Sequence, residues 1–196
     1  MAHAEKLGIF IQEVLKEGNL AVDELQAVAV SAGPGSYTGL RIGTALAKGL
    51  CYPNNIPLIG IDSLMILAEK FITEHGNKLD EEGLLCPMID ARRLEVFTAV
   101  YSLEGETILT SSAMEITTEF LSEIRSSRPI YFIGNGAKKT SEIISQGYSE
   151  FYPDFLSSSS GMAMLSYQKF VSRDFENLAY FEPSYLKEAF ITQAKS

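Results

Sequence analysis

The chain has 196 residues, 46% of them hydrophobic and 21% charged, with a formal net charge of −9. This composition is typical of a globular protein that buries a core, and it argues against global disorder. The negative charge argues against a protein that binds nucleic acid alone, because phosphate neutralisation needs clustered Lys and Arg. It still allows a role in RNA metabolism through a basic partner. The only cysteines, Cys51 and Cys86, lie in apolar runs and are expected to be buried thiols in a reducing compartment.

No apolar run approaches the ~18 residues that span a bilayer. The N-terminus also lacks a cationic region followed by a long apolar one, the pattern of a secretory signal. We therefore expect a cytoplasmic protein with no membrane partner.

Helices and strands are expected to alternate in the first part of the chain, which predicts parallel strands joined by helices. The expected elements are a helix over 4–18, an uncharged strand over 27–31, a helix over 40–52, a strand over 56–62 and a helix over 63–75 with Ser63 as its N-cap. A polar linker over 76–83 follows. The helix over 40–52 is apolar on nearly every side and has only Arg41 and Lys48 as charges. Such a helix is buried on more than one side, and we expect another subunit to supply part of that burial.

The pattern changes to successive strands in the second part. The expected elements are strands over 84–91, 95–103 and 107–116, a helix over 118–126, a strand over 129–136, and helices over 137–146 and 161–173. Residues 104–106 (EGE) supply a hairpin turn, and the aromatic tail over 180–187 is expected to be ordered. This order is typical of a ribonuclease-H-like half. The first part repeats only the end of that order, as if three opening strands were absent.

Residues 33–39 (GPGSYTG) link the strand over 27–31 to the helix over 40–52, and backbone amides in such a turn can bind an anion. Gly33, Gly35, Ser36 and Gly39 are therefore weak candidates for nucleotide binding. The lysine of a P-loop is missing, and the third glycine comes one residue too late for a dinucleotide fingerprint. Asp62, at the end of the next strand, stands where a ribose-binding acid would lie. A tight turn that packs helix against strand remains the structural alternative.

The sequence contains few residues that could act as catalytic groups or metal ligands. Ser36 has no histidine following it as a base, and the two histidines and two isolated cysteines make no credible metal cluster. Asp90, Arg92 and Arg93 follow a strand and form either a site or, more commonly, a charged turn. We predict no catalytic residue and no metal ligand.

The run over 31–68 (SAGPGSYTGLRIGTALAKGLCY…IPLIGIDSLMILA) resembles the signature of the TsaB (YeaZ) family, as do residues 3–5, 88–101 and 180–187. The resemblance implies an α/β protein of the actin-like ATPase (ASKHA) fold with two ribonuclease-H-like halves. The first half would comprise 1–80 plus 178–196 and lack its opening strands, and the second would comprise 81–177. In the catalytic paralogue TsaD, two metal-binding histidines lie four residues apart. The matching positions here are Ser63 and Leu67, which cannot hold a metal.

The resemblance also implies a function. The chain would be a non-catalytic scaffold or activator for threonylcarbamoylation of adenosine 37 in tRNAs that read codons beginning with A. Its expected partners are a second copy, a TsaD-type transferase and a TsaE-type ATPase, with tRNA contacted only indirectly. It would have no intrinsic cofactor, although ATP or ADP could sit at the partner complex, and no protease activity.

The resemblance implies association through the first two helices. The predicted interface residues are Leu7, Phe10, Ile11, Val14, Tyr37, Leu40, Arg41, Thr44, Ala47 and Lys48. The alternative is an enzyme that binds a nucleotide with the loop over 33–39.

Overall fold

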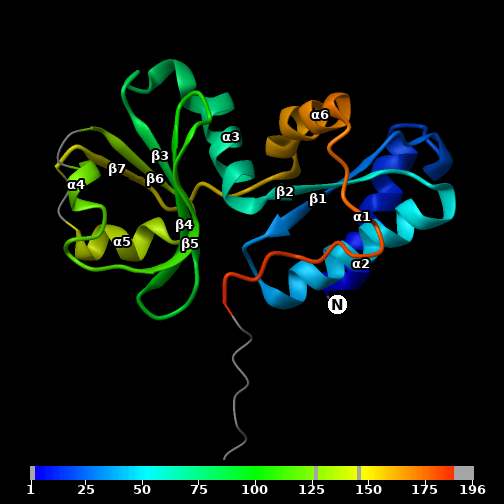
Figure 1. Cartoon of the computed structure of the whole chain (residues 1–196), viewed down its shortest axis with the longest axis horizontal. Coiled ribbons are helices and arrows are strands. Elements are labelled where there is room, and N and C mark those ends of the chain that lie inside the picture. Colours follow the sequence, from blue (N-terminus) through cyan, green and yellow to red (C-terminus); the bar gives the residue numbers. More distant parts are fainter. Residues whose placement is uncertain (1–2, 126–127, 145–146, 188–196) are drawn as a thin grey trace, which may run out of the picture.

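The protein contains two β-sheets with helices packed between and around them, as the computed structural model shows for residues 3–125, 128–144 and 147–187 (Figure 1). The helices are α1 (His3–Glu17), α2 (Tyr37–Asn54), α3 (Ser63–His75), α4 (Ser122–Arg125), α5 (Ala137–Ile143) and α6 (Ala163–Ser172). Short 3-10 helices are η1 (Val22–Glu24), η2 (Gly76–Lys78) and η3 (Ser159–Met162). The strands are β1 (Val28–Gly33), β2 (Leu58–Asp62), β3 (Leu84–Asp90), β4 (Glu95–Ser102), β5 (Thr107–Glu115), β6 (Ile130–Ile133) and β7 (Ser149–Tyr152).

The first sheet consists, within the described residues, of the parallel strands β1 and β2, with Val28 opposite Leu58. Its two faces carry different helices. On one face Val28 and Val30 pack with Ala47 of α2, and on the other Ala29 packs in a cluster with Phe170 of α6. Figure 1 shows the sheet between α6 on one side and α1 and α2 on the other. The covering of both faces is what an uncharged strand predicts.

The second sheet has five strands in the order β5-β4-β3-β6-β7. β3, β4 and β5 form an antiparallel meander, whereas β6 and β7 run parallel to β3. The hairpin turn over 104–106 is confirmed, because Gly105 has a φ of 86° and its N–H donates to the carbonyl of Ser102. This is the strand order expected of a ribonuclease-H-like half.

Helix α3 joins the two sheets. Its side chains Leu64, Leu67 and Phe71 pack on the second sheet, whereas Ile66 packs in the cluster on β2. A helix that is apolar on opposite faces is buried on both. Helix α3 therefore packs on both sheets through apolar side chains.

The structure differs from the expected element boundaries at several points. α2 begins at Tyr37, earlier than expected, because Ser36 caps it. α3 is capped by Asp62 rather than by Ser63, since the carboxylate accepts from the N–H groups of Leu64 and Met65. β7 was not expected, and its two apolar residues do not distinguish a four-residue strand from a loop.

The last helix lies against the first sheet, although the predicted division of the chain placed residues 81–177 in the second half. Helix α6 packs on the first sheet because Leu165 and Phe170 cover Ile59 and Ile61 of β2. The preceding η3 lies against α3, where a Cβ on Gly161 would stand 2.4 Å from the carbonyl oxygen of Ile66. Two segments distant in sequence thus build the first half.

Candidate functional site

The glycine-rich loop ends in a well-formed helix start. The Ser36 hydroxyl accepts a hydrogen bond from the N–H of Gly39 at 3.4 Å, which satisfies one of the free amides at the start of α2. Gly33 has a φ of 105°, and a Cβ there would lie 2.5 Å from the carbonyl oxygen of Ser184. Gly33 therefore allows the tail to pass close to β1, and this role requires no ligand.

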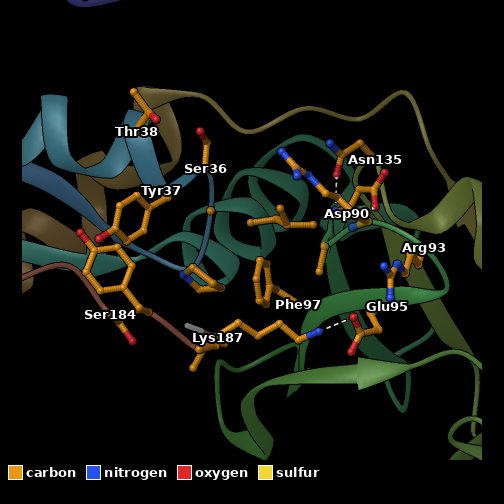
Figure 2. A pocket seen from close by; sticks show the side chains of 17 residues that line it. Ser36, Tyr37, Thr38, Asp90, Arg93, Glu95, Phe97, Asn135, Ser184 and Lys187 are labelled. Atoms are coloured by element: carbon orange, nitrogen blue, oxygen red, sulfur yellow. Dashed lines mark hydrogen bonds and ion pairs between the residues drawn. The ribbon is translucent and has the colours of Figure 1, made fainter. Parts of the chain in front are cut away.

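A cleft of about 770 Å³ opens between this loop and the second sheet (Figure 2). Ser36, Tyr37 and Thr38 line one side, and Figure 2 shows Asp90 and Asn135 on the opposite side. The remaining lining residues are Pro34, Gly35, Ile89, Ala91, Arg92, Arg93, Glu95, Phe97, Ser184, Tyr185, Leu186 and Lys187. The weak nucleotide-binding candidates Gly35 and Ser36 thus border the cleft, whereas Gly33 and Gly39 are outside its lining.

The predicted trio Asp90, Arg92 and Arg93 forms the tight turn between β3 and β4. Both arginines adopt positive φ, 71° and 49°, and the Asp90 carboxylate accepts from the N–H of Arg92 at 2.8 Å. Lys139 of α5 donates to the same carboxylate oxygen at 2.7 Å and to the carbonyl of Arg93 at 3.0 Å. The three residues therefore form a charged turn in which Arg92 and Lys139 already donate hydrogen bonds to the Asp90 carboxylate. A charged turn was the more common of the two interpretations that the sequence allowed.

The electrostatics of Asp90 follow from these contacts. Partial burial alone would raise the pKa of its carboxyl group, but the hydrogen bonds from Lys139 and from the N–H of Arg92 outweigh it and lower the pKa below the ordinary value of 3.8. Asp90 is therefore an anion at neutral pH. A carboxylate with a lowered pKa that already accepts two hydrogen bonds is a poor general base.

Asp62 has structural contacts at both carboxylate oxygens. Oδ1 accepts from the N–H groups of Leu64 at 2.7 Å and Met65 at 3.1 Å, and Oδ2 accepts from the hydroxyl of Ser111 at 2.9 Å. The residue caps α3 and ties the first sheet to β5. Its place at the end of β2 is explained by these bonds without a ribose, so the nucleotide-enzyme alternative loses the residue that supported it most.

Other reactive groups are buried. Burial raises the pKa of the Cys86 thiol to about 12, against a smaller lowering by its bond with Thr98, and burial also raises the pKa of Cys51. Ser63 and Leu67 are 8% and 2% exposed, and the hydroxyl of Ser63 bonds that of Ser31. Within 3–125, 128–144 and 147–187, no group of three or more His, Cys, Asp and Glu side chains could hold a metal ion. In the same ranges, none of the helices is long and apolar enough to cross a membrane.

Helix α1 exposes much of its apolar surface. Leu7 and Ile11 are half-buried, whereas Phe10 is 55% and Val14 67% exposed. The described side chains of α1 include none that is fully buried. We call Phe10, Val14 and the neighbouring Ile9 the α1 face.

The predicted interface residues of α2 divide into two groups. Tyr37 and Arg41 are exposed and Lys48 is half-buried, and the Arg41 guanidinium lies 4.3 Å from the centre of the Tyr37 ring. Leu40, Thr44 and Ala47 are buried within the chain, at 9%, 6% and 5% exposure. These three cannot offer side chains to a partner as expected, since they face the interior of the first half.

The tail supplies part of the burial of α2 within the chain itself. Phe181 packs with Ala47 and Cys51, the N–H of Ser184 donates to the carbonyl of Ala32 at 2.7 Å, and Lys187 forms an ion pair with Glu95 of β4. The tail thus runs along α2 and reaches the second sheet. The aromatic residues of the tail predicted its order, but no local pattern predicted where it docks.

Comparison with known proteins agrees with this fold. Residues 1–195 match the sequence profile of the family described as TsaD, tRNA N6-adenosine threonylcarbamoyltransferase. The YeaZ structure from Pseudomonas aeruginosa superposes with a TM-score of 0.79 at 24% identity, covering 94% of this chain and 84% of that one. A Pseudomonas aeruginosa protein described as similar to the peptidase YeaZ superposes with a TM-score of 0.83 at 21% identity, over 95% and 85% of the two chains. These neighbours confirm the actin-like fold.

Curated relatives give the family in finer detail. The tRNA threonylcarbamoyladenosine biosynthesis protein TsaB of Bacillus subtilis is 32% identical over 139 residues, 68% of this chain and 57% of the relative. TsaB of Escherichia coli is 32% identical over 99 residues, 50% of this chain and 41% of the relative. The chain therefore spans about half the length of these relatives. The chain belongs to the tRNA N6-adenosine threonylcarbamoyltransferase (TsaD) family, and both of the curated relatives compared above are TsaB proteins.

Proposed function

We propose that this protein is a scaffold subunit in the formation of threonylcarbamoyladenosine at position 37 of tRNA, without catalytic activity of its own. Two TsaB relatives carry the name of this pathway. In this proposal the chain binds a TsaD-type transferase and holds it in an active conformation. A TsaE-type ATPase joins the complex in the cytoplasm, ATP or ADP sits at the partner complex, and tRNA is contacted through the partners.

The observation that carries the proposal is the α1 face. Phe10 and Val14 are more than half exposed on a helix whose other side packs on α2, and contiguous exposed apolar side chains mark interaction sites. A transferase helix that covers this face would gain the burial of two large apolar side chains. The same face would serve the homodimer when the transferase is absent.

Lack of catalysis is supported by the contacts already described. The Asp90 and Asp62 carboxylates are bonded within the fold, and burial keeps the Cys86 thiol protonated at neutral pH. The cleft is lined by Arg92 and Lys187 as well as by Glu95, so its charges are mixed. We assign the cleft no reaction.

The test is isothermal titration of the chain with a purified TsaD-type transferase. Val14→Asp should weaken binding at least about 30-fold, the equivalent of roughly 2 kcal/mol, because a charge would be buried in an apolar contact. Val171→Asp is the matched control, since Val171 of α6 is 64% exposed and Val14 67%, and it should bind like the wild type. Equal affinities for wild type and Val14→Asp would overturn the assignment of the α1 face. Threonylcarbamoyl transfer by the chain without the transferase would overturn the scaffold role.

A further inference from the structure

Arg41 is packed against two aromatic side chains on the exposed side of α2. Its guanidinium lies 4.3 Å from the centre of the Tyr37 ring, which is the distance of a cation–π contact. The guanidinium also donates to the hydroxyl of Tyr185, and this hydrogen bond is the largest cause of the raised pKa of Arg41. The rings of Tyr37 and Tyr185 pack on each other with their centres 4.7 Å apart. We call Arg41, Tyr37 and Tyr185 the arginine platform.

The arginine platform is attached to the body of the protein through both tyrosines. Tyr37 is the first residue of α2, directly after its cap Ser36. Tyr185 follows Ser184, whose N–H donates to the carbonyl of Ala32 in β1 at 2.7 Å. A surface arginine ordinarily loses much side-chain entropy when it forms an ion pair. Because contacts within the chain already restrict this arginine, less entropy remains to be lost on binding.

The charge of Arg41 is not matched by a carboxylate of the same chain. The ion pairs among the residues that the structure describes do not include Arg41, and Glu182 of the tail acts on it only through its charge at longer range. A guanidinium carries several N–H donors in a rigid fork, of which the hydroxyl of Tyr185 takes one. The geometry of the fork matches a carboxylate that binds it with both oxygens.

We propose that Arg41 binds a carboxylate of the TsaD-type transferase and thereby selects the transferase over a second copy of this chain. The proposal rests on the scaffold role and adds a polar contact beside the α1 face, since α1 packs on α2. Arginine and tyrosine are among the residues that contribute most to binding at protein interfaces. The arginine platform therefore has the composition and the order of an interface anchor.

The charges of α2 disfavour a second copy as the source of the carboxylate. The charged residues of α2 are Arg41 and Lys48, and both are basic. In a symmetric dimer the same surface of each copy meets its counterpart, so a contact between two α2 helices brings like charges together. A transferase that presents a carboxylate at this point gains an ion pair instead. One residue thus favours one partner and opposes the other.

The experiment compares both associations in Arg41→Met, which removes the charge and keeps a long side chain against Tyr37. Isothermal titration with the purified transferase should show binding weakened at least about tenfold, because the partner's carboxylate is left without its ion pair. Light scattering over a range of concentrations should show a homodimer as tight as that of the wild type or tighter. Arg173→Met removes the same charge at an exposed position after α6. It is the matched control and should bind the transferase like the wild type.

Salt dependence gives a second readout, one that a purely structural role of Arg41 would not change. The affinity of the wild type for the transferase should fall as salt is added, because salt screens the ion pair. Arg41→Met should show a smaller dependence on salt. Arg41→Lys, which keeps the charge but loses the fork, should have an affinity between those of Arg41→Met and the wild type.

Three results would overturn the proposal in distinguishable ways. If Arg41→Met binds the transferase as tightly as the wild type while Val14→Asp does not, the scaffold role stands and the role of Arg41 is refuted. If Arg41→Met weakens the homodimer as much as the heterodimer, Arg41 does not select, and a second copy supplies the carboxylate, for example from Glu13 of α1. If the wild type does not bind the transferase, the scaffold role fails, and the proposal for Arg41 fails with it.

Discussion

β1 of the first sheet is buried less completely than β3 and β6, the central strands of the second sheet. In the second sheet, Leu84 of β3 and Phe132 of β6 are 1% and 0% exposed. In the first, Val28 and Val30 of β1 are only half-buried. Among the described residues, β1 and β2 each have one strand neighbour. Leu58 and Ile59 of β2 are nonetheless only 1% exposed, because α3 and α6 pack on that strand, so burial within the first sheet differs from strand to strand.

The largest effect is expected from a pair of side-chain truncations to alanine, one in each sheet. Phe132→Ala should lower the free energy of unfolding by about 3–5 kcal/mol, since the ring is fully buried and stacks on Phe151 with the ring centres 5.0 Å apart. Val30→Ala should cost about 1 kcal/mol or less, because its methyl groups are already partly exposed. Urea denaturation measures both. Equal losses would show that β1 is as well buried in solution as β6.

A second test concerns the junction of β1 with the tail. Gly33→Ala should destabilise the protein by about 1–3 kcal/mol, because the φ of 105° is unfavourable for alanine and the new Cβ would meet the carbonyl oxygen of Ser184. Limited proteolysis should then cut the tail near Ser184 faster than in the wild type. Gly105→Ala, at a φ of 86° but with open space around it, is the control that separates backbone strain from the clash. Unchanged cleavage in Gly33→Ala would contradict the docking of the tail on β1.

A third test addresses the bond between the two regions. Ser111→Ala should cost about 1 kcal/mol, because it leaves Oδ2 of Asp62 without its hydrogen bond from β5. Thermal unfolding measures the loss. Ser112→Ala, one residue along the same strand, is the control. If both variants unfold at the wild-type temperature, the bond contributes nothing to holding β5 against the first half.

The smallest effect is expected at the β3–β4 turn. The pKa of Asp90 is lowered in the folded state, so its charge stabilises the fold above the ordinary carboxyl pKa, and this stability is lost as the pH falls through the folded value. Asp90→Asn should cost less than about 1 kcal/mol at pH 7, since the side chain is partly exposed, and the difference from wild type should vanish in acid. A difference that is the same at pH 7 and in acid would show that the charge is not responsible.

Local patterns predicted most of the elements correctly. Helical spacing of apolar residues identified α1, and the EGE turn identified the β4–β5 hairpin. The run over 31–68 was specific enough to indicate the family. Each of these signals comes from residues close together in the sequence, where chain geometry alone links pattern to structure.

Tertiary contacts decided what the local patterns could not. The apolar residues of α2 fit a partner or an interior equally well, and the tail buries Ala47 while Tyr37 stays exposed. Asp62 fits a ribose-binding acid by position, but it caps α3 and bonds Ser111, which is 49 residues away. The sequence by itself determined the family and most of the elements, but not β7. Only the tertiary structure decided which side chains face outward, because burial depends on segments that meet from distant parts of the chain.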